Sequence, residues 1–325
     1  MAKVKNFKTI FPAVSVPLND DYSINEPEFR AYLRWIKSFY GKGMDGLVCN
    51  GHTGEITGLT RAERKRVVEI CAEECGDVMT IISGVNCENT EESIEMAKEA
   101  KEAGADGILL MPPHMWLRFG MNPNAPFEYV KDVAEGADID IIIHLYPATS
   151  KAFYPVETLI KMCKEIDHVK CIKMGTRVTS IYEHDVRLLR QECPDISLIT
   201  CHDETLCVSW FPGMDGALIG FAGCVPEIIC PARDVFANPD KHTLKEAQDW
   251  SDRIYHISQA IYGGGQPSGE AHARLKEALK QRGIFTSALM RKPVLPLNQE
   301  EKDWVALGLE RSQLPEVDMT QYQDK

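Results

Sequence analysis

Eight short apolar runs alternate with eight helix-like segments in this chain, and this repeat restricts the fold more than any other feature. Most of the runs are apolar throughout rather than alternating, which is typical of parallel strands buried on both faces. The sequence therefore predicts a parallel sheet in which a helix follows each strand. The predicted strands are residues 11–17, 46–50, 79–83, 107–111, 139–145, 169–174, 197–201 and 216–220. The predicted helices between them are residues 26–40, 61–74, 91–103, 126–134, 156–165, 180–191, 204–210 and 227–236.

Eight β/α units of this length can close into a (β/α)8 TIM barrel, which is an α/β fold. A doubly wound open sheet is the main alternative, but no Gly-x-Gly-x-x-Gly turn follows the first run. Three further helical segments follow the eighth unit, at residues 241–262, 269–282 and 299–311. We therefore expect a catalytic barrel in residues 1–237 and a C-terminal helical extension packed on it in residues 238–325. The acidic segment after Leu314 should fray.

Composition argues against several classes of protein. The net charge of −12 disfavours a nucleic-acid-binding surface, although it says little about a small anionic substrate. No uninterrupted apolar run reaches about 18 residues, so we expect no membrane partner, and the N-terminus does not resemble a secretory signal. Eleven cysteines without a Cys-x-x-Cys pair disfavour structural zinc and favour reduced core thiols. We expect a cytoplasmic protein that needs no metal and no cofactor.

Lys173 is the residue that most strongly suggests a catalytic role. It lies in the apolar run 169–174, where alternation places Lys173 on the same face as Val169 and Cys171. Lys170 is at the start of this run and could reach water, whereas Lys173 lies deeper. Burial lowers the pKa of an ammonium group, and the free amine can then form a Schiff base with a carbonyl compound. A salt-bridged structural lysine is the alternative.

In such a barrel, the reactive residues lie at the carboxyl ends of the strands. The second run ends in the sequence Gly51-His52-Thr53-Gly54-Glu55. Two glycines around a small hydroxyl residue allow a tight turn whose backbone N–H groups can bind an anion. Gly51, His52 and Thr53 are therefore candidate ligands of a substrate carboxylate. The alternative is an ordinary turn capped by Thr53.

The fourth and fifth runs end in aromatic residues and histidines. Two prolines hold the loop that carries His114 and Trp116, which could contact a substrate or another subunit. His144 and Tyr146 share one face of the fifth run, so either could move a proton beside Lys173 on the next strand. Each of these side chains could instead serve only in packing, and each histidine could be a hydrogen-bonded residue of the core.

The seventh run ends in His202-Asp203-Glu204, the most metal-like sequence in the chain. Together with the histidines at neighbouring strand ends, His202 could form a divalent-metal site, or it could contact the substrate. The same three residues could instead cap the next helix, where acids favour the helix dipole. The eighth run is small and tightly packed, and its backbone around Leu218 could face a ligand.

Taken together, these motifs resemble the dihydrodipicolinate synthase/N-acetylneuraminate lyase family of class I pyruvate-dependent aldolases, over about residues 8–312. The resemblance implies a (β/α)8 barrel with a C-terminal helical segment, usually a homotetramer. It also implies that Lys173 is the Schiff-base lysine and that the turn at His52 and Thr53 receives a pyruvate-type carboxylate. The motifs are Gly51-His52-Thr53-Gly54-Glu55, residues 141–147, Ile172-Lys173, Gly216-Ala217-Leu218 and Arg291-Lys292-Pro293.

Some positions depart from the family pattern. His144 stands where the family has a phenolic proton relay, and Thr149 stands where the synthases have an arginine. Residues around Pro113 and His114 replace the paired tyrosines of a subunit-crossing loop. Residues 113–116 and 202–204 are more similar to the hydratase-aldolases that cleave benzylidenepyruvates, although those enzymes keep the tyrosine. This similarity implies an apolar, aryl-type substrate group near Trp116.

The residues and the resemblance together predict a Schiff-base-forming lyase that acts on pyruvate or a substituted 2-oxo acid, with an aldehyde as a further partner. Aldolase, hydratase-aldolase and dehydratase activities all fit this chemistry. Two alternatives stay open. One is a metal-dependent aldolase or hydratase in the same barrel, and the other is a non-catalytic paralogue that binds 2-oxo acids.

Overall fold

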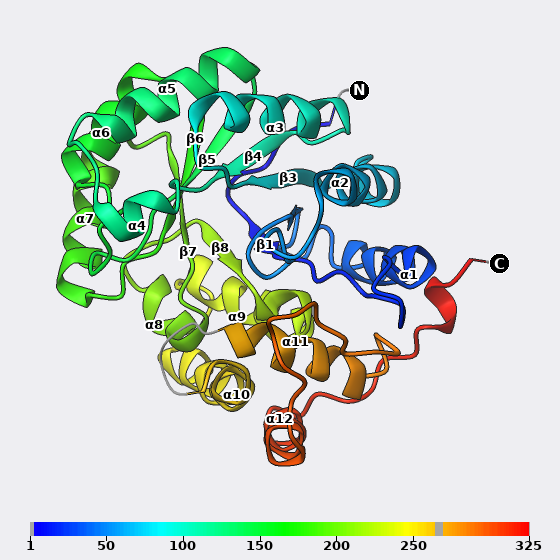
Figure 1. Ribbon diagram of the computed structural model, residues 1–325. Coiled ribbons are helices and arrows are strands. Elements are labelled where there is room, and N and C mark those ends of the chain that lie inside the picture. The colour runs from blue at the N-terminus through cyan, green and yellow to red at the C-terminus, as the bar shows by residue number, and fades with distance from the viewer. Residues whose placement is uncertain (1–2, 264–268, 325) are drawn as a thin grey trace.

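The computed structural model describes residues 3–263 and 269–324 and confirms the (β/α)8 barrel. Eight parallel strands lie at the centre and helices surround them (Figure 1). The strand order is β1-β8-β7-β6-β5-β4-β3-β2, and the ring closes where Ala13, just after β1, pairs in parallel with Val48 of β2. The strands are β1 Ile10–Pro12, β2 Gly46–Cys49, β3 Thr80–Val85, β4 Gly107–Leu110, β5 Asp140–His144, β6 Val169–Met174, β7 Ser197–Thr200 and β8 Gly216–Ile219.

The helices follow the strands in the expected alternation, and their start signals are those of the sequence. Thr60 and Glu63 form a capping box at the start of α2, and the Asn89 side chain accepts a hydrogen bond from the Glu92 N–H at the start of α3. The helices of the barrel are α1 Glu26–Lys37, α2 Arg61–Cys75, α3 Thr90–Glu102, α4 Met115–Phe119, α5 Ala125–Ala137, α6 Val156–Glu165, α7 Thr179–Glu192, η1 Asp203–Thr205, α8 Leu206–Trp210, η2 Phe221–Gly223 and α9 Pro226–Ala237.

Three elements differ from the sequence prediction. β1 ends at Pro12 instead of residue 17, although the Ala13 N–H still donates to the Ile219 carbonyl oxygen at 3.3 Å and the Val14 N–H to the Val48 carbonyl oxygen at 3.0 Å. The helix predicted at 204–210 is split into the 3-10 turn η1 and the short helix α8. A short helix that the pattern did not predict, α4, begins directly after the turn at His114. Each difference lies at the end of a strand, where the loops rather than the hydrophobic period decide the local structure.

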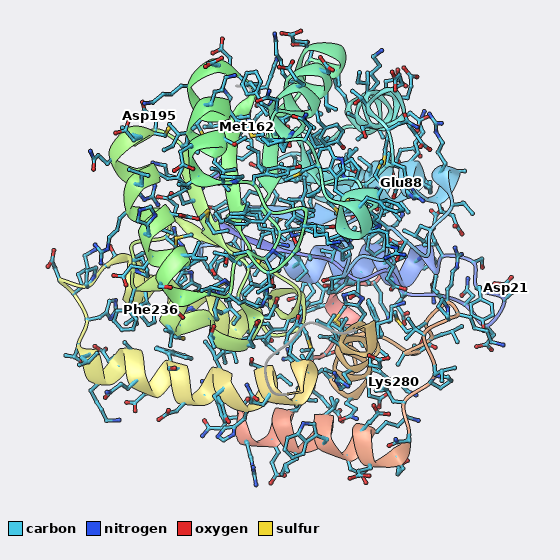
Figure 2. All side chains as sticks on the ribbon, turned by 60° about the vertical axis from the view of Figure 1, so that its left-hand side comes forward. Asp21, Glu88, Met162, Asp195, Phe236 and Lys280 are labelled. Atoms are coloured by element: carbon cyan, nitrogen blue, oxygen red, sulfur yellow. The ribbon has the colours of Figure 1, made fainter. Side chains whose placement is uncertain are left out.

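Apolar side chains fill the barrel and the layer between the sheet and the helices (Figure 2). Every residue of β2, β3, β4, β7 and β8 is buried, which explains the continuous apolar runs. Close contact of the strands requires a small residue at one position in particular. A Cβ atom at Gly216 of β8 would lie 1.9 Å from the Thr9 carbonyl oxygen, so a larger residue would separate β8 from β1.

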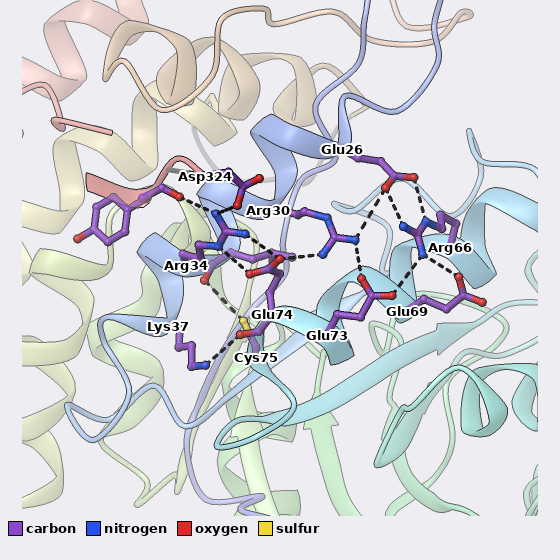
Figure 3. A network of polar contacts seen from close by, with 12 residues as sticks. Glu26, Arg30, Arg34, Lys37, Arg66, Glu69, Glu73, Glu74, Cys75 and Asp324 are labelled. Carbon is purple, nitrogen blue, oxygen red and sulfur yellow. Dashed lines mark hydrogen bonds and ion pairs between the residues drawn. The ribbon is translucent and has the colours of Figure 1, made fainter. Parts of the chain in front are cut away.

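A network of ion pairs joins α1 to α2 on the surface of the barrel (Figure 3). Arg34 pairs with Glu74, at 2.7 Å between Nε and Oε2, and with Asp324, at 2.6 Å between Nη1 and Oδ1. Its guanidinium also donates to the Tyr322 carbonyl oxygen at 3.1 Å. The prediction of a frayed acidic tail is therefore wrong, because its last described residues are held against α1 by a basic side chain that only the folded chain brings near.

The C-terminal helices lie together on one side of the barrel, next to α9 and the loops after β7 and β8 (Figure 1). Within the described residues, no helix is both long and apolar enough to cross a membrane. Arg291, in the segment between α11 and α12, pairs with Glu63 of the α2 capping box at 2.5 Å. These elements are α10 Leu244–Tyr262, α11 Gly269–Gln281, α12 Gln299–Arg311 and η3 Thr320–Tyr322.

A buried ion pair attaches α11 to the barrel. Lys276 Nζ lies 2.6 Å from Glu55 Oε1 and donates to the Leu289 carbonyl oxygen at 2.9 Å. Both side chains are almost fully buried, at 1% and 8% exposure. Burial raises the pKa of Glu55 and lowers the pKa of Lys276, whereas their mutual attraction opposes both shifts. Either group would be a costly buried charge without the other.

We predict that Lys276→Met lowers the free energy of unfolding by about 3–5 kcal/mol, because it leaves the Glu55 carboxylate buried without a partner. Urea unfolding measures the loss. The double variant Lys276→Met/Glu55→Gln should recover part of it, since no unpaired charge is then buried. Lys245→Met is the matched control, because Lys245 pairs with Asp249 on the surface and is 74% exposed. The Lys245→Met change should lower the free energy of unfolding by less than about 1 kcal/mol. A Lys276→Met variant as stable as Lys245→Met would contradict the prediction.

Candidate active site

Lys173 projects from β6 into the barrel with part of its side chain accessible. Its neighbour Lys170 is exposed and donates to the Asp167 carbonyl oxygen at 2.6 Å, as the alternation of the strand predicts. Among the described residues, no acid lies within ion-pair distance of Lys173 Nζ and no hydrogen bond holds it. Burial lowers the pKa of its ammonium group. This contradicts a salt-bridged structural lysine and leaves an amine free to react.

His144 lies directly beside Lys173. The last residue of β5, His144, is paired in register with Lys173 of β6, so both side chains point to the same side of the sheet. Burial lowers the pKa of His144 well below its usual value, and the positive charge of Lys173 adds to that effect. The ring is therefore neutral near pH 7. Among the described residues, its Nδ1 atom has no hydrogen-bond partner.

Tyr146 connects two further histidines. Its hydroxyl lies 3.4 Å from His52 Nε2 and 3.4 Å from His114 Nε2, and its ring packs edge-on against His144 with 4.9 Å between centroids. Asn86 Nδ2 lies 3.3 Å from His114 Nε2, and because an amide nitrogen can only donate, that ring nitrogen must accept. A continuous polar path therefore runs from His52 through Tyr146 and His114 to Asn86.

The turn after β2 has the geometry of an anion site. Asn50 and Glu55 adopt left-handed backbone conformations, with φ of 52° and 67°. Gly54 packs so closely that a Cβ atom there would lie 2.5 Å from the Val14 carbonyl oxygen. Within the described residues, no protein group accepts a hydrogen bond from the backbone N–H groups of His52 and Thr53. These N–H groups are available to an anionic ligand. Burial and the nearby charge of Lys173 lower the pKa of His52 to about 3.

His202 lies beside this group, on the loop after β7. Its Nε2 donates to the Thr176 carbonyl oxygen at 2.7 Å, and its ring packs against Tyr182 at 4.7 Å between centroids. Burial lowers its pKa to about 4, so it is neutral near pH 7. Arg177 and Glu204 form an ion pair next to it. A cavity of about 440 Å³ opens here between α7 and α8, and it is lined by Arg177, Tyr182, His202, Glu204, Val208 and Phe211 among others.

The other two predicted site residues, Trp116 and Leu218, are buried. Trp116 is buried in α4, where its ring packs edge-on against Tyr129 and Tyr154 at 5.7 and 6.2 Å between centroids. Leu218 is buried in β8. Their contact with a substrate stays a prediction. Within the described residues, no three His, Cys, Asp or Glu side chains are arranged to hold a metal ion.

Sequence reasoning missed three residues that the fold brings to this site. Asn86 follows β3, and only its contact with His114 connects it to the predicted group. Asp203 is part of the sequence His202-Asp203-Glu204, but the sequence alone does not show that its charge acts on Lys173. Tyr262 is at the end of α10, and its hydroxyl would lie 2.5 Å from a Cβ atom at Gly220, whose N–H donates to Asp203 Oδ1. The strand period could locate the first two near the rim, whereas no local pattern points to Tyr262.

Comparisons of the sequence and of the fold with known proteins point to one family. The family described as "Dihydrodipicolinate synthetase family" matches residues 6–311. The chain is similar to the 4-hydroxy-tetrahydrodipicolinate synthases of Agrobacterium fabrum, at 36% identity over 79% of this chain and 83% of that protein, and of Bartonella bacilliformis, at 25% identity over 94% and 98%. Its fold is similar to that of YagE from E. coli K12, a structure in complex with pyruvate, with a TM-score of 0.84 and 21% identity over 95% of this chain and 99% of that chain.

The neutral histidines of this site predict a specific pH dependence of stability. The pKa of His52 is about 3 in the folded chain and about 6.5 in the unfolded chain. Only the unfolded chain therefore binds this proton at intermediate pH, and stability is lost as the pH falls from 6.5 toward 3.

In His52→Gln, the slope of unfolding free energy against pH should be smaller by about 1.4 kcal/mol per pH unit in this range. Urea unfolding at several pH values measures it, and His184→Gln, whose side chain is 66% exposed, is the control. If the unfolding free energy of His52→Gln had the same slope against pH as that of the wild type, the lowered pKa of His52 in the folded chain would be disproved.

Proposed function

Because the chain belongs to the dihydrodipicolinate synthetase family, we propose that it is a pyruvate-dependent lyase that works through a Schiff base on Lys173. One observation carries the proposal. The Lys173 amine lies inside the barrel without an ion-pair partner among the described residues, and its pKa is lowered by burial. A lowered pKa leaves a larger fraction of such an amine unprotonated, and the unprotonated amine is the nucleophile.

The residues suggest a sequence of steps. Lys173 Nζ adds to the ketone carbon of the 2-oxo acid, and the carbonyl oxygen leaves as water when the imine forms. The protonated imine then accepts the electron pair of the carbon–carbon bond that breaks, which gives an enamine and an aldehyde. His144 takes the hydroxyl proton of the departing aldehyde carbon and, in the reverse direction, returns it. A neutral imidazole can accept this proton, and burial keeps the His144 ring neutral near pH 7.

The turn after β2 would hold the substrate carboxylate. The N–H groups of His52 and Thr53 and the Thr53 hydroxyl would donate to it, and the backbone from Gly51 to Thr53 would fix its orientation. Thr53 Oγ1 would lie 3.0 Å from a Cβ atom at Gly220, so this hydroxyl is at the rim beside β8. The Glu55–Lys276 pair supports the far end of the same turn.

We further propose that the second partner is an apolar, aryl-type aldehyde, as in benzylidenepyruvate hydratase-aldolases. Thr149 offers no positive charge at the position where the synthases have an arginine. Histidine and tyrosine rings border the site, and the adjoining cavity has Tyr182, Val208 and Phe211 on its wall. Aromatic walls favour a flat apolar group over a charged one.

The residue ranges and assembly of the proposed enzyme follow the sequence prediction. We propose that residues 1–237 form the catalytic barrel, that residues 238–325 form a segment packed on it, and that the chain assembles as a homotetramer. Large apolar side chains are exposed on α10 and α12, which pack against each other. Tyr255 is 56% and Trp304 is 48% exposed. A surface of this kind favours association with another copy of the chain.

The central prediction is that pyruvate and borohydride fix a reduced pyruvate adduct on Lys173. Peptide mass spectrometry locates the adduct. Lys173→Ala should abolish both trapping and lyase activity, whereas Lys170→Ala, which removes an exposed lysine three residues away, should leave both unchanged.

Three other outcomes have distinct meanings. Lack of an adduct in a folded wild-type protein would contradict the Schiff-base mechanism. Activity that survives Lys173→Ala but disappears with a chelator would indicate a metal-dependent aldolase. Trapping without turnover, across a panel of 2-oxo acids and aryl aldehydes, would indicate a protein that binds 2-oxo acids without catalysis.

The two candidate proton carriers can be separated. His144→Gln should lower kcat by about 10²- to 10⁴-fold, the usual contribution of a general acid–base group, and should leave pyruvate trapping intact. Tyr146→Phe removes the hydroxyl between His52 and His114, but keeps the ring that packs on His144. It should lower kcat by less than about tenfold. The reverse ranking of the two variants would assign proton transfer to Tyr146.

A further inference from the structure

The outer face of α12 carries a row of four side chains. Figure 1 shows this helix at the outer edge of the molecule, next to α10 and α11 and away from the strands. Glu300, Trp304, Leu307 and Arg311 recur at intervals of four, three and four residues, so at 3.6 residues per turn they fall within about 60° of one helix face. We call this set the α12 stripe. Trp304, near its centre, is 48% exposed, although tryptophan side chains are on average well buried.

The two ends of the α12 stripe carry opposite charges that have no partner in the protomer. Glu300 and Arg311 are both exposed, and within residues 3–263 and 269–324 neither side chain forms an ion pair or a hydrogen bond. Glu301, in the same turn, differs in that its Oε1 atom lies 3.7 Å from Arg274 Nη1. An α-helix rises about 1.5 Å per residue, so about 16 Å separates Glu300 from Arg311 along α12. The two charges therefore cannot pair with each other inside one copy.

Two hollows follow the groove between α10 and α12, one toward each end of the stripe. Trp304 and Leu307 line both hollows, together with Ala260 of α10. Glu300 lines only the larger hollow, of about 440 Å³, and Arg311 lines only the smaller one, of about 220 Å³. The groove therefore has an apolar centre, an acidic end and a basic end.

Close packing against α10 holds α12 in place. A Cβ atom at Gly308 would lie 2.4 Å from the Ala260 Cβ, so the two helices approach as closely as a glycine allows. Trp304 Nε1 donates to the Gln259 carbonyl oxygen at 3.5 Å, and the capping box of Asn298 fixes the first turn of the helix. The stripe is thus a preformed surface, which loses little conformational freedom when a partner binds.

The order of residues in the stripe is complementary to its own reverse. A two-fold axis midway between Trp304 and Leu307 would set a second α12 antiparallel to the first. Glu300 of each copy would then lie opposite Arg311 of the other, and Trp304 opposite Leu307, with every contact made twice, as in isologous interfaces. Alternating intervals of three and four residues are also typical of the seam between two packed helices. Two ion pairs would enclose an apolar centre.

We propose that α12 forms a two-fold interface between copies of this chain, in which two α12 stripes pack antiparallel. A second copy suits the groove because it offers the opposite charge at both ends and apolar side chains at the centre. A parallel arrangement would set Glu300 beside Glu300, and like charges in contact oppose binding. This contact would be one of the two-fold contacts of the homotetramer proposed above, on which the inference rests.

Sedimentation equilibrium of the full-length protein, over a range of concentrations, tests the interface by exchanging its charges. Glu300→Arg places arginines opposite Arg311, and Arg311→Glu places acids opposite Glu300. Each single variant should raise the dissociation constant of this contact at least about tenfold, so that the mass falls to half at concentrations where the wild type is assembled. The double variant Glu300→Arg/Arg311→Glu should regain the wild-type mass, because both ion pairs form again with their signs exchanged.

Trp304→Ala removes the apolar centre and should raise the same dissociation constant at least about 30-fold, as expected for a tryptophan that dominates an interface. Asp132→Arg is the matched control. Asp132 is an exposed acid of α5 without an ion-pair partner among the described residues, and α5 lies on the other side of the barrel from α12 (Figure 1). This variant changes the net charge as Glu300→Arg does and should keep the wild-type mass.

The outcomes separate this interface from the rest of the proposed function. A wild type that stays monomeric at every concentration would overturn both the interface and the homotetramer. Assembly that the single charge variants leave unchanged, or a double variant that stays dissociated, would overturn only the antiparallel α12 contact. If circular dichroism shows that Trp304→Ala does not fold, the charge variants decide, since they alter only exposed side chains. Pyruvate trapping on Lys173 in the same samples tests the Schiff base separately, and its failure in an assembled wild type would leave the interface standing.

Discussion

Parallel pairing of all eight strands is the constraint on which the rest of this structure depends. It brings the carboxyl ends of β2, β5, β6 and β7 to one rim, although the residues there are far apart in the sequence. Strand register then fixes the reacting groups, because the pairing of His144 with Lys173 sets the two side chains beside each other. A shift of one residue would turn one of them away from the site. The chemistry therefore depends on the backbone ladder before it depends on any side-chain contact.

Two lysines with lowered pKa values have opposite environments. Lys276 has a carboxylate partner at 2.6 Å, so it can remain charged and serve as an attachment point for α11. Lys173 has no such partner within the described residues, and its pKa falls for that reason as well as through burial. The same residue type is structural in one position and is the proposed nucleophile in the other. Pairing, rather than burial alone, separates the two roles.

Patterns within short segments of the sequence predicted the structure of those segments. The apolar runs indicated all eight strands, and the alternation within the sixth run separated the exposed Lys170 from the partly buried Lys173. Contacts between distant segments had no such signal. The burial of Trp116 against Tyr154 depends on how two loops meet, and the docking of Asp324 on α1 depends on the whole barrel being closed. The roles of the predicted site residues stay predictions, because side-chain position alone does not establish a reaction.

The C-terminal helices have a consequence for how this chain could be recombined with its relatives. They contribute one partner to each of two pairs beside the site, Lys276 for the Glu55 carboxylate and Ser258 for the Asp203 carbonyl oxygen. A chimaera that joined this barrel to another protein's C-terminal helices would separate both pairs at once. It could keep every strand and still leave a buried carboxylate without its cation. The two parts should therefore be inherited together, so that in evolution the barrel and its helices form one exchangeable unit.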